Sequence, residues 1–305
     1  MKFNLEVFRS LHNCSPSFAV NGVSQASNLQ CKTMSFALKI DTKLINSLRE
    51  IDSVIMFVPR DSALHEECYS NNLLIEVINP RYAYIKTTRG VFDQSNRDFD
   101  EGRRLSYIHP SSLVAQTAEL APFIYIGPNC VVEDDCILAS GSRLLENVHL
   151  GKGTKVGANT VIGGWGFGIE RDNGKEREVI PFGGKPLKMP HFGGVVIGEN
   201  CDIGALTTIC AGAIEPTILE SDVMVDDHVH ISHNCKIRQG AAVIACAEIS
   251  GSVEIGEEAW IGPNAAIMQK ISIGPRTIIG LGAVVLKSTP PDSISVGNPA
   301  KQLNT

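Results

Sequence analysis

The sequence predicts a mainly β protein, a parallel β-helix of hexapeptide repeats preceded by a small α/β domain. Aliphatic residues recur every six positions over two long stretches, from Val114 to Ile162 and from Leu219 to Val285. The first hundred or so residues lack this period and show the patterns of buried strands and amphipathic helices. A period of six fits neither the 3.6-residue turn of a helix nor the two-residue alternation of a single strand, and it is the signature of a β-helix.

The α/β domain is expected over residues 1–104. Its expected elements are two buried strands and two helices: SVIMFVP (53–59), LLIEVIN (73–79), TKLINSLRE (42–50) and PRYAYIKTTRGVF (80–92). Pro80 lies in the first turn of the second helix, where a missing N–H is tolerated. The polar stretch QSNRDFDEGRR (94–104) is the expected linker to the β-helix. We expect this small domain to bind the nucleotide or another part of the substrate.

The β-helix is expected over residues 105–305, with a loop inserted at 163–196. Nine aliphatic positions run in steps of six from Val114, the period returns for three positions from Ile197, and twelve more follow after a phase shift at Leu219. Each hexad supplies a short strand, a turn and one inward aliphatic side chain, and glycine or asparagine allows the tight corners. At three hexads a coil there are about eight coils. Three hexads are eighteen residues, so residues eighteen apart lie above one another at the strand spacing of roughly 4.8 Å.

Composition excludes several classes of function. An apolar content of 43% is that of a soluble globular protein, and no apolar run is long enough to cross a bilayer. The N-terminus lacks a signal peptide, so we expect a cytoplasmic protein. A formal charge of −6 without a long basic run argues against nucleic acid as a partner. The nine cysteines form no C-x-x-C pair, which favours reduced thiols filling small core positions.

The inserted loop at 163–196 is rich in glycine and carries four aromatic residues, Trp165, Phe167, Phe182 and Phe192. Long loops on rigid scaffolds are usually functional or disordered, and the aromatic residues favour ordered packing, including packing across a subunit interface. We expect Trp165, Phe167 and His191 to contact the substrate.

The segment VMVDDHVHISHNCKI (223–237) holds three histidines within six residues. The eighteen-residue stacking rule places His230 beneath Glu248, Lys236 beneath Glu254, and His233 beneath Gly251, which would leave open space above that imidazole. Asp226 and Asp227 are near enough in sequence to orient a ring nitrogen. An imidazole held by a carboxylate and facing open space suits a general base.

Two other interpretations of this cluster compete with the base. A polar surface face explains it equally well from the residues alone. A metal site needs three histidines converging on one ion, and strand side chains alternate faces, which works against convergence. A γ-type carbonic anhydrase keeps the metal hypothesis as a minority alternative, although such chains are shorter and have no α/β domain ahead of the coil. We expect no bound metal.

Several motifs distributed over nearly the whole chain point to one family. They are VNGVSQASNLQCKTMSF (20–36), Asn79-Pro80-Arg81, Gly164-Trp165-Gly166-Phe167-Gly168, KMPHFG (188–193), TTICAGA (207–213), ISHN (231–234) and IACAEISGS (244–252). Together they resemble the motifs of the UDP-3-O-acylglucosamine N-acyltransferases of lipid A synthesis. The resemblance implies a left-handed β-helix, a homotrimer with sites between neighbours, and His233 as catalytic base. In such a mechanism a sugar amine attacks an acyl thioester, and the Gly251 N–H is a candidate donor to the oxyanion.

The chain also departs from that family. Lys39 and Thr42 lie where the family holds uracil with an asparagine and an aromatic residue, and Lys270 replaces a second histidine. The ending VGNPAKQL (296–303) is similar to that of sugar acetyltransferases that use coenzyme A. Lys270, Arg276 and Lys287 are therefore candidates to meet the phosphates of acyl-coenzyme A.

The expected function is an N-acyltransferase that acts on a nucleotide-linked amino sugar, such as a dTDP-linked amino-deoxyhexose. Acyl-coenzyme A, including a 3-hydroxyacyl form, is the expected donor, with no permanently bound cofactor and a product used in lipopolysaccharide O-antigen. His233, Asp226 and Gly251 are the expected catalytic residues, and His230, Asp227 and Glu248 the expected sugar contacts. The alternatives are the lipid A enzyme itself with an acyl carrier protein as donor, and a non-catalytic assembly module.

Overall fold

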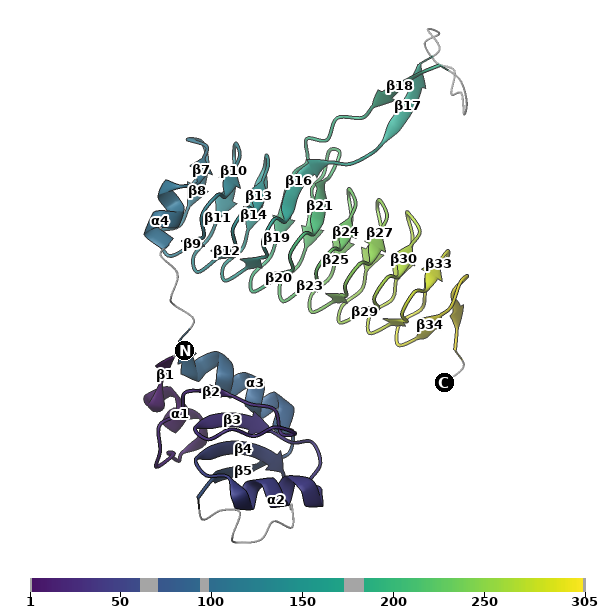
Figure 1. Ribbon diagram of the computed structural model, residues 1–305. Coiled ribbons are helices and arrows are strands. Elements are labelled where there is room, and N and C mark those ends of the chain that lie inside the picture. The colour runs from purple at the N-terminus through teal and green to yellow at the C-terminus, as the bar shows by residue number, and fades with distance from the viewer. Residues whose placement is uncertain (1, 61–70, 94–98, 173–183, 304–305) are drawn as a thin grey trace. The chain divides into compact units, whose positions relative to one another are not determined.

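The computed structural model describes residues 2–60, 71–93, 99–172 and 184–303 (Figure 1). The chain divides into two compact units, 1–97 and 98–305. This boundary lies earlier than the expected one, because the second half of the expected linker is a helix, α4 (Phe99–Arg104), that belongs to the second unit. Arg103 attaches it by donating hydrogen bonds to the carbonyls of Ala115 (2.7 Å) and Ala118 (2.8 Å). Residues 94–98 of the expected linker lie outside the described residues.

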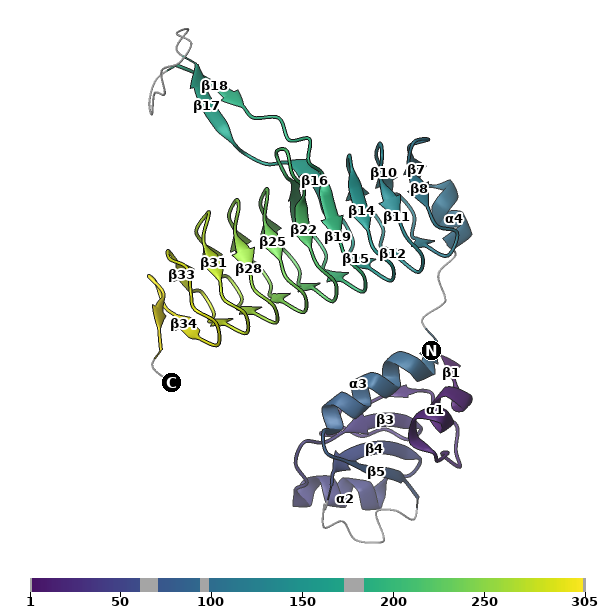
Figure 2. The ribbon, with the colours of Figure 1, turned by 180° about the vertical axis from the view of Figure 1, so that it is seen from behind.

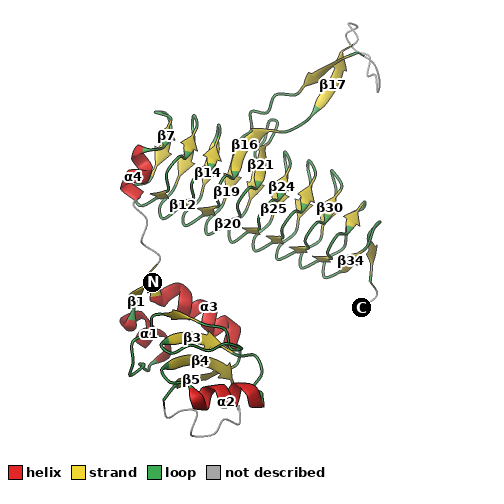
Figure 3. Ribbon diagram, in the orientation of Figure 1, coloured by secondary structure: helices red, strands yellow, loops and turns green. Residues whose placement is uncertain are grey.

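The N-terminal unit contains a four-stranded parallel sheet in the order β2-β3-β4-β5 (Figure 3). Its elements are β1 (Lys2–Phe3), α1 (Leu5–His12), β2 (Gly22–Val23), β3 (Thr33–Phe36), α2 (Thr42–Glu50), β4 (Val54–Pro59), β5 (Leu73–Val77), α3 (Pro80–Val91) and β6 (Phe92–Asp93). Strand β4 is buried on both faces. Met56 packs with Leu48 of α2 on one face, whereas Phe57 packs with Phe8 of α1 on the other. This two-sided burial explains the continuous apolar run that predicted the strand.

The second unit is a left-handed parallel β-helix, as the sequence predicted. Its described strands form three parallel sheets of nine, eight and ten strands, one sheet on each side of the coil (Figure 1). The first sheet contains β7 (Tyr107–Ile108), β10 (Tyr125–Ile126), β13 (Arg143–Leu144), β16 (Val161–Trp165), β21 (Thr208–Ala211), β24 (His230–Ile231), β27 (Glu248–Ile249), β30 (Ala266–Ile267) and β33 (Val284–Val285). The coil thus begins one hexad before the first predicted position.

The other two sheets complete each coil. The second contains β8 (Leu113–Val114), β11 (Val131–Val132), β14 (Val148–Leu150), β19 (Val195–Ile197), β22 (Thr217–Leu219), β25 (Lys236–Ile237), β28 (Glu254–Ile255) and β31 (Ser272–Ile273). The third contains β9 (Glu119–Leu120), β12 (Ile137–Leu138), β15 (Lys155–Val156), β20 (Asp202–Ile203), β23 (Met224–Val225), β26 (Ala242–Val243), β29 (Trp260–Ile261), β32 (Ile278–Ile279), β34 (Ile294–Val296) and β35 (Lys301–Gln302), of which the last runs antiparallel.

The interior of the coil confirms the six-residue rule. Ile231 pairs with Ile249, eighteen residues on, and Ile249 pairs in turn with Ile267. All three side chains are at most 1% exposed. Small side chains fill the second inward position of many hexads, and Cys136 and Cys235 are buried there as free thiols, as expected.

The corners of the coil explain the polar half of the repeat. Residues with left-handed backbone also recur every six positions, as at Asn129, Asp135 and Gly141. Asparagine, aspartate and glycine tolerate this conformation at little cost, and so they fill many of these corners. His228 (φ 59°), Lys270 (φ 61°) and Arg276 (φ 53°) take the same corner position.

A column of charges crosses the coils on the outer surface. Arg238 donates hydrogen bonds to Glu220 (2.8 Å) in the coil before and to Glu254 (2.8 Å) in the coil after. Glu254 was expected to pair with Lys236, but the longer guanidinium reaches both carboxylates and takes that place. The hydrogen bond from Arg238 holds the pKa of Glu220 below its ordinary value.

Replacing Arg238 with methionine is expected to lower the free energy of unfolding by about 1 kcal/mol at pH 7, since partly exposed ion pairs contribute little. The pKa of Glu220 is lowered in the folded state, so this stabilisation is present above about pH 4.5 and is lost as the pH falls below it. Thermal melts of the two proteins at pH 7 and pH 3.5 test this. A deficit that does not shrink at pH 3.5 contradicts the ion-pair explanation.

No helix among the described residues is long and apolar enough to span a membrane.

Candidate active site

Two excursions interrupt the regular coil, and both end beside His233. The first leaves the coil after β16 and returns at β19, so Ile162 pairs with Ile209 rather than with a residue eighteen positions on. It carries the antiparallel hairpin of β17 (Ile169–Asp172) and β18 (Lys185–Lys188), which projects away from the coil (Figure 2). The second excursion, at 212–216, lies between β21 and β22. These excursions are the physical cause of the gap and the phase shift in the repeat.

The imidazole of His233 is packed between two glycines. A Cβ on Gly251 would lie 2.7 Å from Nε2 of His233, and a Cβ on Gly166 would lie 2.8 Å from its Cδ2. Side chains do not tolerate such approaches, so both positions require glycine while the ring stays in place. The sequence correctly predicted Gly251 above His233. The expected open space is absent, however, because the imidazole itself fills the room that glycine provides.

Asn234 determines which nitrogen of His233 carries the proton. Its Nδ2 donates to the Glu215 carbonyl (3.1 Å) and its Oδ1 accepts from the Ala213 N–H (3.1 Å), which fixes the orientation of the amide. The same Oδ1 lies 3.1 Å from Nδ1 of His233. Because that oxygen can only accept, Nδ1 of the neutral ring carries the hydrogen and Nε2 carries the lone pair. A half-buried imidazole in this tautomer is suited to remove a proton through Nε2.

The expected carboxylate partners lie elsewhere. Asp226 accepts from the N–H groups of Asp227 (2.8 Å) and Ala245 (3.2 Å), and Asp227 accepts from that of Ala205 (2.6 Å). Both aspartates therefore cap backbone at corners of neighbouring coils. The predicted role of Asp226 in orienting the base is filled by the side chain of Asn234.

The other two histidines of the cluster differ from His233. His230 stacks on Glu248 in the strand register, but its Nδ1 bonds to the hydroxyl of Thr208 (2.6 Å), one coil earlier. His228 is exposed at a corner of the coil. Among the described residues, no group of three or more histidine, cysteine or acidic side chains is arranged to hold a metal ion.

Gly251, the predicted oxyanion donor, packs against Nε2 of His233. Some other corners of the coil have an acceptor for the equivalent N–H, such as the Asp226 carboxylate for Ala245 (3.2 Å). For Gly251, no acceptor is found within the described part of the chain. A free N–H beside the base is the geometry that an oxyanion donor requires.

The base of the inserted excursion covers this corner with aromatic side chains. Trp165 is 50% exposed and meets Phe192 edge to face, with 6.2 Å between ring centroids. Phe167 is 78% exposed, and Nζ of Lys188 lies 5.8 Å from its centroid. His191, expected to touch the substrate, is instead only 3% exposed. Phe182 lies outside the described residues.

The three basic residues expected to meet the donor's phosphates lie in late coils and do not form one cluster. Arg276 pairs with Asp292 through bonds of 2.6 and 2.7 Å, which occupies its guanidinium. Lys270 is exposed at a corner, and Lys287 lines a cavity of about 380 Å³ near the C-terminal end of the coil.

Two cysteines near the coil axis are unsuited to covalent catalysis. Burial raises the pKa of the Cys235 thiol to about 12 and that of the Cys201 thiol to about 11. Both are therefore protonated at neutral pH, and a protonated thiol is a poor nucleophile.

Replacing Asn234 with alanine is expected to lower kcat about tenfold or more with little change in KM, because the His233 ring loses its tautomer-selecting partner. The tautomer is read from the ¹⁵N chemical shifts of the ring nitrogens. An alanine variant that keeps the wild-type kcat and the Nδ1–H tautomer would show that Asn234 does not orient the base.

Asn234 and Gly166 were missed as site residues by the sequence reasoning. The available signal for Asn234 was its place in the ISHN motif, directly after His233, because a polar neighbour in sequence can bond the imidazole. Nothing in the sequence placed Gly166 against His233, since the two are brought together only by the return of the excursion.

The comparisons with known proteins agree with this architecture. The model of the family described as bacterial transferase hexapeptide (six repeats) matches residues 129–164 and 252–287. A UDP-3-O-acylglucosamine N-acyltransferase of Xanthomonas axonopodis pv. citri is 44% identical over 103 residues, which cover 34% of this chain and 28% of that protein. A protein of the same name from Coxiella burnetii is 27% identical over 262 residues, covering 78% of this chain and 71% of that protein. The chain resembles the UDP-3-O-acylglucosamine N-acyltransferases.

Solved structures give the same result for the fold. A UDP-N-acetylglucosamine acyltransferase from Bacteroides fragilis superposes with a TM-score of 0.55 at 25% identity, over 65% of this chain and 72% of that one. The enzyme of that name from Francisella novicida gives a TM-score of 0.56 at 26% identity, over 65% and 67%. The expected enzyme class, an acyltransferase, is confirmed by these relatives. They do not support the expected dTDP-linked acceptor or acyl-coenzyme A donor.

Proposed function

We propose that this chain is an N-acyltransferase that moves an acyl group from a thioester to the amine of a nucleotide-linked amino sugar, with His233 as general base. The observation that carries the proposal is the arrangement at His233. Asn234 binds Nδ1, and Nε2 is left with its lone pair. Gly251, whose N–H has no acceptor among the described residues, packs against that nitrogen. A base and an oxyanion donor at one corner are the two groups that acyl transfer needs.

The proposed reaction proceeds by direct transfer. The sugar amine attacks the thioester carbonyl, a C–N bond forms, and Nε2 of His233 takes the proton that the amine sheds. The Gly251 N–H donates to the oxyanion of the tetrahedral intermediate. The C–S bond then breaks, and the imidazolium returns its proton to the departing thiolate. No covalent enzyme intermediate and no resident cofactor are needed, because the acyl thioester is itself a substrate.

The curated relatives favour a UDP-linked glucosamine as the acceptor over the dTDP-linked sugar first expected. They are named for a glucosamine that is already acylated at O3 and linked to UDP. We therefore rank this acceptor first, with a hydroxyacyl carrier protein as donor, and place the product in lipopolysaccharide synthesis. Acyl-coenzyme A, with Lys287 near its phosphates, is the competing donor.

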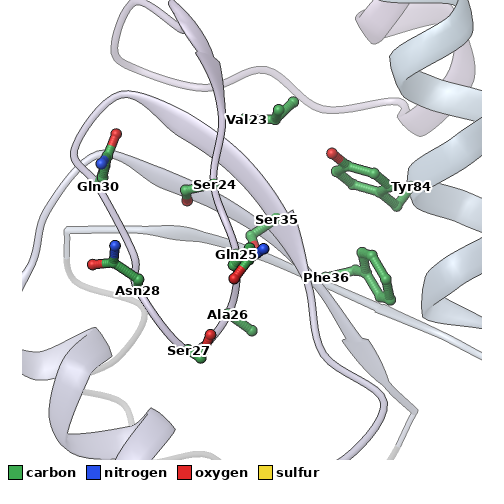
Figure 4. Close-up of a pocket in the computed structure, with 10 residues that line it drawn as sticks. All are labelled: Val23, Ser24, Gln25, Ala26, Ser27, Asn28, Gln30, Ser35, Phe36 and Tyr84. Atoms are coloured by element: carbon green, nitrogen blue, oxygen red, sulfur yellow. The ribbon is translucent and has the colours of Figure 1, made fainter.

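The N-terminal unit supports binding of a neutral planar group. A cavity of about 610 Å³ in this unit is lined by side chains with amide or hydroxyl groups and by two rings, those of Phe36 and Tyr84, whose centroids are 4.9 Å apart (Figure 4). None of the described residues that line it is charged. The hydroxyl of Ser35 is buried there and has no hydrogen-bond partner among the described residues. We propose that this cavity receives the base of the nucleotide by stacking and hydrogen bonds.

We also propose that the chain assembles as a homotrimer, since the aromatic side chains at the base of the inserted excursion are exposed. Trp165, Phe167 and Phe192 are 50%, 78% and 67% exposed. Exposed apolar patches of this kind commonly mark protein interfaces. Sedimentation equilibrium measures the state directly, and a monomeric protein at micromolar concentration would contradict this part of the proposal.

The test of the function is an acyl-transfer assay that pairs each acceptor with each donor. The expected result is turnover of UDP-3-O-acylglucosamine with a 3-hydroxyacyl carrier protein. Turnover only of dTDP-amino sugars with acyl-coenzyme A would reverse the ranking of substrates and keep the mechanism. Absence of transfer with every pair, together with nucleotide-sugar binding by thermal shift, would favour the non-catalytic module.

A further inference from the structure

The inserted excursion places a second histidine, His191, beside the base. His191 is 3% exposed, and its Nδ1 lies 2.9 Å from the Met189 carbonyl. A carbonyl only accepts, so Nδ1 carries the hydrogen and Nε2 carries a lone pair. That Nε2 is buried and has no hydrogen-bond partner within the described part of the chain. Buried polar atoms are normally bonded, and exceptions are frequent at functional sites.

The unpartnered nitrogen belongs to a ring that contacts the imidazole of His233. The rings of His191 and His233 meet edge to face, with 5.1 Å between their centroids and 67° between their planes. A Cβ on Gly166 would lie 2.8 Å from Nε2 of His191 and 2.8 Å from Cδ2 of His233. One glycine therefore leaves room for both atoms. The bare Nε2 of His191 and the Cδ2–H edge of His233 border this same glycine.

The charge on that C–H edge of His233 changes during the proposed reaction. When Nε2 of His233 takes the amine proton, the positive charge of the imidazolium spreads over the ring and its C–H groups. A fixed lone pair in a site shielded from water stabilises such a charge more than water-exposed groups do, because it needs no reorganisation. A neutral ring provides this, whereas a charged His191 would oppose the second positive charge.

We propose that His191 is a positioning residue that supports His233 while His233 carries the substrate's proton. This inference rests on the proposed role of His233 as general base. The resembled family has a second histidine at the place of Lys270 in this chain, whereas His191 belongs to the inserted excursion. The step moves no proton to His191, because the proton that Nε2 of His233 takes up passes to the departing thiolate.

The kinetic test separates ring shape from the lone pair. His191→Phe keeps a planar ring and removes the acceptor, whereas His191→Gln keeps an acceptor oxygen and removes the ring. We expect the phenylalanine variant to lose about tenfold in kcat with KM unchanged, and the glutamine variant to recover part of that loss. His109→Phe, a histidine of the first coil, is the matched control and should keep the wild-type kcat. Equal losses in both His191 variants, or full activity of His191→Phe, would overturn the proposal.

A second experiment needs no substrate, and it therefore tests the inference even if a variant fails to fold or the transfer assay fails. In histidine-labelled wild-type protein at pH 7, ¹⁵N shifts should show His191 neutral, with Nδ1 protonated and Nε2 bare, and ¹H–¹³C shifts of the His233 Cδ2–H group should change in His191→Phe. A protonated Nε2 on His191, or an unchanged Cδ2–H signal, would overturn the inference. A wild-type protein that transfers no acyl group refutes the proposed function instead, and the ring shifts still decide whether the two histidines interact.

Discussion

Replacing His233 with glutamine is expected to lower kcat for acyl transfer by about 10²- to 10⁴-fold, the usual contribution of a general base. The substituted amide cannot take up the amine proton at neutral pH, although it fills a similar space. Binding of the nucleotide sugar should persist, because the proposed nucleotide cavity lies in the other unit. The measurement is steady-state turnover together with binding of the acceptor by calorimetry.

The control for this prediction is His109→Gln, at a histidine whose side chain bonds only Ser111 within the described residues. It should retain both turnover and thermal stability. A His233→Gln protein with a wild-type rate would remove His233 from the mechanism.

Replacing Gly251 with alanine is expected to cost about 10²-fold in kcat while leaving the coil folded. The new methyl group would meet Nε2 of His233 at 2.7 Å and Cε1 at 2.8 Å, so the imidazole must move away from its working position. The ring is the end of a rotatable side chain, and its displacement costs little stability. A misplacement of roughly 1 Å in a reacting group is enough for a rate loss of this size.

The matched control is Gly164→Ala in strand β16, where the nearest atom to the new methyl group is Cδ1 of Leu145 at 3.9 Å. This variant should have nearly the wild-type kcat. Loss of the thermal unfolding transition in Gly251→Ala would show that the glycine is required for folding. Full activity of this variant would show that the tight packing against the imidazole does not affect catalysis.

The fold was predictable in unusual detail because each turn of a β-helix is specified by residues close together in the sequence. Each hexad carries its own inward aliphatic residue and its own corner residue, so the register between coils follows from counting by eighteen. The pairing of His230 with Glu248 was obtained this way and is confirmed. In the N-terminal unit, the apolar run at 53–59 predicted β4, which is buried on both faces.

Counting by eighteen did not predict which side chains form hydrogen bonds between coils. Glu254 stacks on Lys236 as predicted, yet its hydrogen bonds come from Arg238 because a guanidinium is long enough to connect two carboxylates. His230 bonds to Thr208, its register partner in the preceding coil, which counting by eighteen misses because the excursion at 212–216 lengthens that coil. Register specifies which backbones are adjacent, and side-chain length and geometry select the partner.

The sequence by itself determined the coil, its two interruptions and the position of His233 beneath Gly251, since these follow from a six-residue period read along the chain. Only the tertiary structure decided what surrounds the base. Asn234 rather than Asp226 binds Nδ1, and His191 and Gly166 arrive from residues far away in the sequence. The physical reason is that an excursion has no repeat. Where it re-enters the coil depends on packing and hydrogen bonds that no period encodes.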